Sequence, residues 1–305
     1  MNLNNENVNK FLSRYIYYVN DISSEYSYPL NIRHLLYLIV PAFIIKYGIS
    51  YEALILKCFK EVKIYISNSE DKRITASFNR NLVKYGDSYF TEKFIVLNQY
   101  KNASLPNLID NIVHEFNHAI NSSINEIKIT KNYLYLRTGL TYRVYKKEDL
   151  SFIRKDKSYL LEEIINTKQT EDIINIIKKF DSTNKSISNT IYAINSETAS
   201  KYNSNSYYLE GYVCKKILTN KTFINTLETL RLNGEVYDIS KWFDDITGKQ
   251  GEYKELINLL NEVYDLEIEY SNRKYFKIFT LNKIKDASNK IMRIVDTFNN
   301  NVNFR

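Results

Sequence analysis

Apolar residues recur along much of this chain at the three-to-four-residue spacing of an amphipathic helix. The spacing is clear from Leu12 to Val19, and two further apolar stretches follow at 33–47 and 51–59. These patterns predict an N-terminal helical segment over residues 1–60. His34 lies near the start of the stretch at 33–47, and we expect it to be a packed or surface histidine rather than a metal ligand.

The apolar period shortens to about two after this segment, which predicts β-strands. Apolar and polar residues alternate over Val62–Ile66 and Ile74–Phe78, and Phe94–Leu97 is a short apolar run that follows Gly86 and Asp87. The three segments predict a small sheet.

The helical period returns over Leu105–Ile124, with Pro106 in the first turn, where its missing N–H costs little. His114 and His118 lie at the edge of the apolar stripe of this helix and are expected to face a cleft. The stripe consists of Leu105, Leu108, Ile109, Ile112, Phe116, Ala119 and Ile120.

The second half of the chain is predicted to be mainly helical. Runs at 133–137 and 140–145 on either side of Gly139 first predict a hairpin, and 158–180 then has a helical pattern. The remainder, 190–300, is mostly helical in pattern, with a turn at Asn233-Gly234 and another near Gly248.

Composition supports a globular, helix-rich protein. The 305 residues are 44% hydrophobic and include only seven glycines and three prolines. The net charge of +7 is spread along the chain without a basic block, so no nucleic-acid partner is expected. Cys58 and Cys214 lie far apart in the sequence and are expected to be reduced packing residues.

No secretory signal or membrane span is expected. The N-terminus lacks a basic region followed by an apolar one. The most apolar run, between His34 and Ile45, is shorter than the ~20 residues that cross a bilayer, and Pro41 interrupts it. We therefore expect a buried helix there and a cytoplasmic location.

Two of the three histidines lie four residues apart in His114-Glu115-Phe116-Asn117-His118. On a helix these positions share a face, so both imidazoles can bind one metal ion. Glu115 projects beside them, where it can act on a metal-bound water. This H-E-x-x-H pattern predicts zinc-dependent hydrolysis of a peptide-like bond.

A catalytic zinc site usually takes three protein ligands and a water. No histidine follows His118, so a carboxylate is needed, and the best candidates lie within 160–173. Glu162 and Glu163 are adjacent there, and the local apolar period does not separate them. Glu171 or Asn166 is a candidate acceptor for a ligand imidazole, although a solvated helix charge is the simpler interpretation of Glu171.

With these features, residues 74–180 resemble the gluzincin branch of zinc metallopeptidases, the thermolysin-like enzymes. In that branch the two histidines of H-E-x-x-H and a glutamate on a second helix hold the metal. The resemblance implies that His114 and His118 bind zinc and that Glu115 is the general base. The third glutamate often follows an asparagine, whose place Glu162 takes here, so Glu163 aligns as the third ligand, with Glu162 or another group as alternatives.

The resemblance also implies an edge strand that binds substrate. Ile74–Phe78 resembles the Ala-x-aromatic edge of these enzymes, and an ordinary sheet strand is the alternative. Related enzymes stabilise the oxyanion with a Tyr, His or Arg. Tyr207 and Tyr208 are the candidates here, and Arg137 is another.

The expected fold class is therefore α+β. A zincin-like catalytic core with a small mixed sheet and the HExxH helix, residues 61–185, is followed by a mainly helical C-terminal lobe, residues 186–305. The expected function is that of a zinc metallopeptidase acting on a peptide or protein substrate. The alternative is a non-catalytic, zinc-stabilised interaction or regulatory protein on the same scaffold, against which the intact Glu115 argues.

Overall fold

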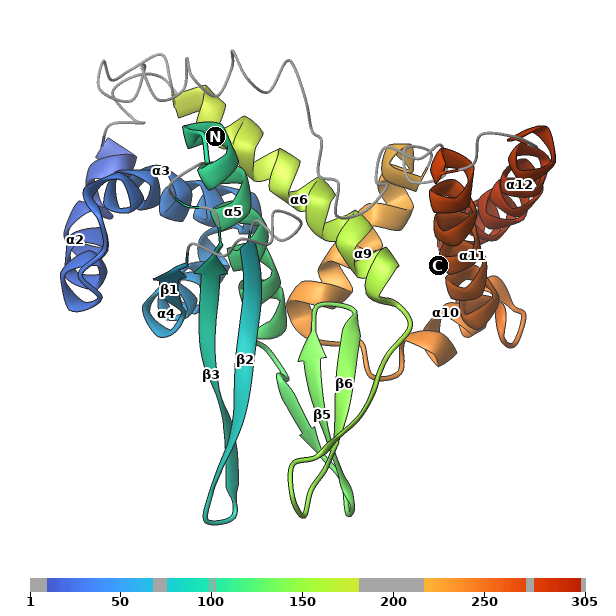
Figure 1. Cartoon of the computed structure of the whole chain (residues 1–305), viewed down its shortest axis with the longest axis horizontal. Helices are drawn as coiled ribbons and strands as arrows, with labels where there is room; N and C mark the ends of the chain where they lie inside the picture. The colour runs from blue at the N-terminus through green and yellow to red at the C-terminus, as the bar shows by residue number, and fades with distance from the viewer. Residues whose placement is uncertain are drawn as a thin grey trace. The chain divides into compact units, whose positions relative to one another are not determined.

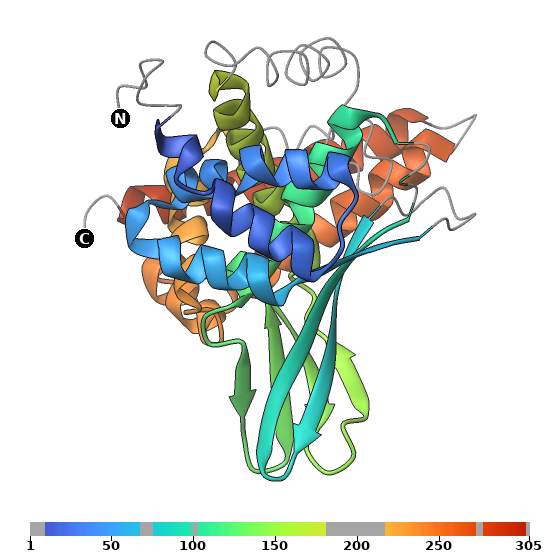
Figure 2. The same cartoon turned by 90° about the vertical axis from the view of Figure 1, so that its left-hand side faces the viewer.

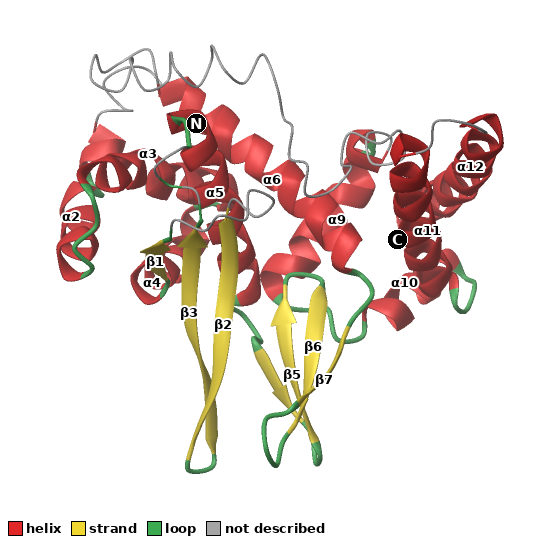
Figure 3. Ribbon diagram, in the orientation of Figure 1, coloured by secondary structure: helices red, strands yellow, loops and turns green. Residues whose placement is uncertain are grey.

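The computed structural model describes residues 10–67, 76–98, 100, 103–180, 217–272 and 277–302. These residues form a mixed α+β protein with two small sheets and many helices (Figures 1 and 3). They fall into two compact units, the first drawn from Met1–Ser123 and Thr167–Asn203 and the second from Ile124–Asn166 and Ser204–Arg305.

Each unit is made of two separate stretches of the chain. The boundary after Ser123 follows the helix that contains the H-E-x-x-H motif, and the boundary after Asn166 lies inside another helix. The division expected from the sequence, at 60/61 and 185/186, stays a prediction.

The helices of the first unit confirm the N-terminal helical pattern. They are α2 (Ile16–Glu25), α3 (Leu30–Tyr47), α4 (Glu52–Glu61) and α5 (Leu105–Ser122), with a short 3₁₀ turn at Ile49–Tyr51. Because α3 packs against α2, α4 and α5, apolar residues surround most of its circumference.

Helix α3 is the one helix in the described part of the chain that is long and apolar enough to cross a membrane. Only its length and its composition suggest a membrane span. Since 56% of the 18-residue stretch is buried inside the structure, the same features suit a core helix.

The first sheet contains β1 (Lys63–Ile66), β2 (Ala76–Tyr85) and β3 (Ser88–Leu97) in the order β1-β3-β2. It is mixed, because β1 runs parallel and β2 antiparallel to β3. The three predicted strands are present, but β2 and β3 are longer than expected and form one hairpin through Gly86 and Asp87. The outer half of this hairpin carries polar and half-exposed residues, so its sequence lacks the apolar alternation of a core strand.

The second unit contains an antiparallel sheet with the order β4-β5-β6-β7. The predicted hairpin is confirmed as β5 (Tyr133–Thr138) and β6 (Thr141–Lys146), and β4 (Ile127–Ile129) and β7 (Phe152–Lys155) flank it. These flanking strands were not predicted, because they are short and their residues are mostly exposed.

The same unit contains a helical core. Its helices are α9 (Lys221–Asn233), α10 (Ile239–Thr247), α11 (Glu252–Asn272) and α12 (Lys277–Val302). Phe223, Phe243 and Phe298 pack together at its centre, with ring centroids 4.8 to 6.3 Å apart. Helix α9 ends at Gly234, whose φ of 72° suits glycine and confirms the predicted turn.

Helix α6 (Tyr159–Lys179), predicted over 158–180, belongs to both units. Its first two turns, up to Asn166, belong to the second unit, and the part from Thr167 onward belongs to the first.

Candidate metal centre

Helix α5 holds the two histidines on one side and a buried apolar stripe on the other. The Ser104 side chain caps its N-terminus by accepting a hydrogen bond of 3.4 Å from the Asn107 N–H. Phe116 stacks on Phe59 of α4, with ring centroids 4.0 Å apart, and this contact fixes the rotation of α5.

The four-residue spacing on α5 places the imidazoles of His114 and His118 next to each other. Their centroids are 5.0 Å apart, and their planes cross at 81°. His118 is buried and His114 is half-buried. The pair thus has the arrangement that the four-residue spacing predicted.

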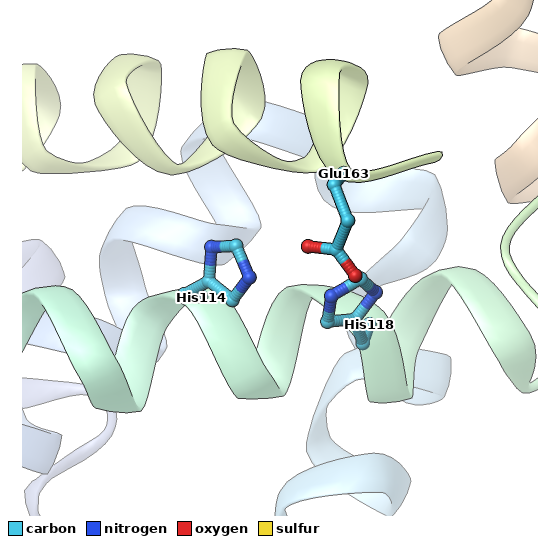
Figure 4. Close-up of side chains that lie close together, drawn as sticks. All are labelled: His114, His118 and Glu163. Carbon is cyan, nitrogen blue, oxygen red and sulfur yellow. The ribbon is translucent and has the colours of Figure 1, made fainter. Parts of the chain in front are cut away.

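Glu163, on the first part of α6, joins His114 and His118 in a group of three side chains that could hold a metal ion (Figure 4). One ligand atom from each of His114, His118 and Glu163 lies within 4.8 Å of the other two. Glu163 lies on the first part of α6, one helical turn before Thr167.

The donor set of this group fits zinc. Two imidazole nitrogens and one carboxylate oxygen are the ligands of the His₂Glu class of catalytic sites. Ligand atoms about 2.1 Å from one tetrahedral ion lie about 3.4 Å from one another, so side-chain movements of about 1 Å would close the group around it. His114, His118 and Glu163 are therefore the residues that could hold the metal.

Glu162 is engaged elsewhere. Its carboxylate is 2% exposed and pairs with the Arg231 guanidinium, with 2.5 Å between Oε1 and Nη2. The Leu140 N–H donates to its Oε2 at 2.7 Å. Gly139, at φ 53°, permits this approach, because a Cβ there would overlap the carboxylate oxygens. Of the two adjacent glutamates, Glu163 is thus the one in the metal-ligand group.

Two other candidates have structural contacts within the second unit. Asn166 accepts a hydrogen bond of 2.9 Å from Arg231. Arg137 is fully buried, and its guanidinium donates to the backbone carbonyls of Gly139, Arg231 and Ile124. Both terminal nitrogens of this guanidinium already donate to backbone carbonyls, and the side chain is buried. Arg137 therefore does not present them to an oxyanion, the role considered from the sequence.

Tyr207 and Tyr208, the other residues considered for that role, lie outside the described residues.

A buried amide network secures the later part of α6 within the first unit. The Gln169 Oε1 accepts hydrogen bonds of 3.2 Å from Tyr47, Asn117 and Asn121. One turn further along, Asp172 accepts from Lys46 of α3 at 2.7 Å and from Lys168 at 2.5 Å. These contacts hold the part of α6 from Gln169 to Asp172 against α3 and α5 of the same unit.

Glu115, the predicted general base, is 8% exposed and lies beside a strand edge. The Phe78 N–H of β2 donates to its Oε2 at 2.6 Å. The expected edge strand is confirmed in part, since β2 is at one end of its sheet, while positions 74 and 75 lie outside the described residues. The described part of this edge therefore reaches the carboxylate of the predicted general base.

Asp110 is a residue that the sequence analysis missed. It precedes His114 by one turn of α5, and its Oδ1 is buried without a hydrogen-bond partner in the described part of the chain. Burial raises the pKa of the Asp110 carboxyl to about 6, His114 opposes this shift, and Glu115 and Glu171 add to it. The i, i+4 spacing to His114 was the available signal.

Comparisons with protein-family models, curated proteins and solved structures found no match. The functional interpretation therefore depends on the chemistry of the residues themselves.

Proposed function

We propose that this chain is a zinc-dependent peptidase. The observation that carries the proposal is the group of His114, His118 and Glu163, whose ligand atoms lie within 4.8 Å of one another. Glu115 follows the first ligand directly and is positioned by the Phe78 amide. A site that only stabilises the fold would need no such carboxylate beside its ligands.

Zinc bound by these three residues would supply Lewis-acid chemistry, polarising a carbonyl and lowering the pKa of water. The Glu115 carboxylate is the proton carrier. It takes a proton from the attacking water and returns it to the amine that leaves when the peptide bond breaks. Its low exposure keeps bulk water away from this transfer.

The edge of β2 supplies the means to hold a peptide. An extended chain can add to an edge strand through backbone hydrogen bonds. Because the Phe78 N–H reaches Glu115, a peptide on this edge would have its backbone beside the proposed general base.

The test is cleavage of a quenched-fluorescent random-peptide pool by the zinc-loaded protein and by Glu115→Gln. The variant keeps both histidines and the shape of the side chain, so it should fold and retain zinc. Without a proton acceptor, its kcat/KM should fall about 10²–10⁴-fold. Glu25→Gln, an exposed change on α2, is the matched control and should cleave like the parent protein.

Equal cleavage by the parent protein and Glu115→Gln would refute the peptidase proposal. So would cleavage that survives removal of zinc by a chelator. A zinc-loaded parent protein that cleaves no peptide would favour the alternative of a zinc-stabilised interaction module.

A further inference from the structure

The antiparallel sheet of the second unit has an apolar tip, formed by residues 129–133 and 145–154. The connections at 130–132 and 147–151 lie at this end of the sheet, away from the helices of the same unit (Figures 1 and 2). Large apolar side chains are 41 to 58% exposed there, namely Ile129, Tyr133, Phe152 and Ile153. Large apolar side chains that gather on a surface indicate contact with another molecule.

The pairing register places these side chains close together and on both faces of the sheet. One row of cross-strand partners crosses all four strands and consists of Ile129, Leu134, Tyr145 and Phe152. Cross-strand partners share one face, and the next residue along a strand has the other face, so Tyr133 lies opposite this row. Three interstrand spacings, about 14 Å, separate the two ends of the row.

The same sheet carries most of the net charge of the protein. Residues 127–155, from β4 to β7, contain eight Lys and Arg residues and two acidic residues, whereas the rest of the chain is close to neutral. The exposed cations among them are Lys128, Lys131, Arg143, Lys146, Arg154 and Lys155. Lys131 lies in the connection before Tyr133, and Lys146 is the cross-strand partner of Tyr133. The pairing of four strands therefore surrounds the apolar tip with positive charge, although the sequence contains no basic block.

An anionic bilayer suits this combination better than other negatively charged partners. A bilayer surrounds a tip that enters it, so it can bury apolar side chains from both faces of the sheet while lysine and arginine reach the lipid phosphates. Nucleic acid offers phosphates but little apolar surface for the aliphatic side chains of Ile129 and Ile153. A second copy of the chain would bring like charges together.

We propose that the sheet tip docks this protein on an anionic phospholipid membrane. The exposed apolar side chains enter the boundary between headgroups and acyl chains, and the surrounding cations pair with the headgroups. Such peripheral binding needs no helix that crosses the bilayer. The inference does not rest on the proposed function, because it uses no residue of the metal-ligand group.

Vesicle flotation of the full-length protein provides the test. The probes are vesicles of phosphatidylcholine alone and vesicles that also contain about 30% phosphatidylserine, each at about 0.05 M and about 0.5 M salt. The parent protein should float with the anionic vesicles at low salt. The bound fraction should fall at high salt, which screens the charges, and should be small with the neutral vesicles.

Two variants separate the apolar contribution from the electrostatic one. Phe152→Ser should weaken binding to the anionic vesicles at low salt about tenfold, because a serine gains little from leaving water. Lys131→Glu combined with Lys146→Glu should weaken it at least about thirtyfold, because two attractive charges become repulsive. Both variants change exposed side chains, so each should keep the melting curve of the parent protein in circular dichroism.

Matched controls make the same changes elsewhere in the same unit. Phe279→Ser removes a phenylalanine of α12 that is 65% exposed. Lys254→Glu combined with Lys290→Glu reverses two exposed charges on α11 and α12. Both controls should bind the anionic vesicles like the parent protein.

Other results would overturn the membrane proposal. These are a parent protein that does not bind the anionic vesicles, equal binding to neutral and anionic vesicles, and binding that Phe152→Ser and the Lys131/Lys146 variant leave unchanged. Labelled single-stranded DNA is the last probe. Binding of DNA, but not of vesicles, that the Lys131/Lys146 variant abolishes would assign the sheet tip to nucleic acid instead.

Discussion

Glu162 and Arg231 form an ion pair in which both side chains are almost completely buried, at 2% and 0% exposure. The pair joins the start of α6 to α9, and its two residues are 69 positions apart in sequence. It occupies the carboxylate immediately before Glu163. The two neighbouring glutamates thus differ, because Glu162 is held in a buried ion pair and Glu163 belongs to the group that could hold a metal ion.

This difference predicts opposite effects of the same substitution. Glu163→Gln should weaken zinc binding at least about tenfold, because an amide is a poorer ligand than a carboxylate, and should barely change the stability of the zinc-free protein. Glu162→Gln should leave the Arg231 charge buried without its counter-ion and cost about 3–5 kcal/mol of unfolding free energy. Chelator competition measures the first effect and urea unfolding of the zinc-free protein the second.

The double variant Glu162→Leu with Arg231→Met is the control, since replacing both charges by apolar groups should recover much of the lost stability. If Glu162→Gln lost zinc and Glu163→Gln retained it, the assignment of the third ligand would be wrong.

Metal content is the most direct prediction. Protein purified without chelator should contain about one zinc ion per chain, and His114→Ala or His118→Ala should remove most of it. His34→Ala is the control, because His34 lies on α3 beside Tyr37 and is expected to leave zinc content unchanged. Elemental analysis showing no transition metal in the parent protein would eliminate the site.

Asp110 is predicted to orient His114. A ligand imidazole usually donates its second ring N–H to a nearby acceptor, and Asp110 places a buried oxygen one turn away on the same helix. Asp110→Ala should weaken zinc binding about 10–100-fold. Glu25→Gln, an exposed change on α2, is the control and should leave zinc binding unchanged. A cobalt-substituted protein whose visible spectrum is the same in Asp110→Ala and in the parent would argue against this role.

The lowered pKa of Asp172 predicts that the free energy of unfolding depends on pH. Burial alone would raise the pKa of its carboxyl, but hydrogen bonds from Lys168 and Lys46 outweigh burial and lower it. A lowered pKa in the folded state contributes stability above the ordinary aspartate pKa, about 3.9, and this contribution is lost as the pH falls through the folded value. Asp172→Asn should therefore destabilise the protein at pH 7, by about 1 kcal/mol.

The difference between Asp172→Asn and the parent should shrink by about pH 3, as measured by urea unfolding at both pH values. Lys57→Gln is a suitable control, since its ion pair with Glu61 is largely exposed and should contribute little at either pH. A difference that stays constant between the two pH values would show that the two lysines do not stabilise the carboxylate.

The sequence by itself determined the local features of this protein. The apolar period predicted α4, α5 and α6, because each buries a face whose spacing is visible in the chain, and the continuous apolar run predicted α3 as a buried helix. The spacing of His114 and His118 predicted their shared face, since one helical turn separates them. The strand pattern missed β4, β7 and the outer hairpin, whose residues are exposed and so lack an apolar signal.

Only the tertiary structure decided which residues far apart in sequence act together. The local apolar pattern did not distinguish Glu162 from Glu163 as the third candidate metal ligand. The structure distinguishes them, because Arg231 on α9 and the turn at Gly139 contact the carboxylate of Glu162. The bond from Phe78 to Glu115 likewise joins a strand to a helix, between residues 37 positions apart in sequence. Such relationships depend on long-range packing and burial, which a local sequence pattern does not record.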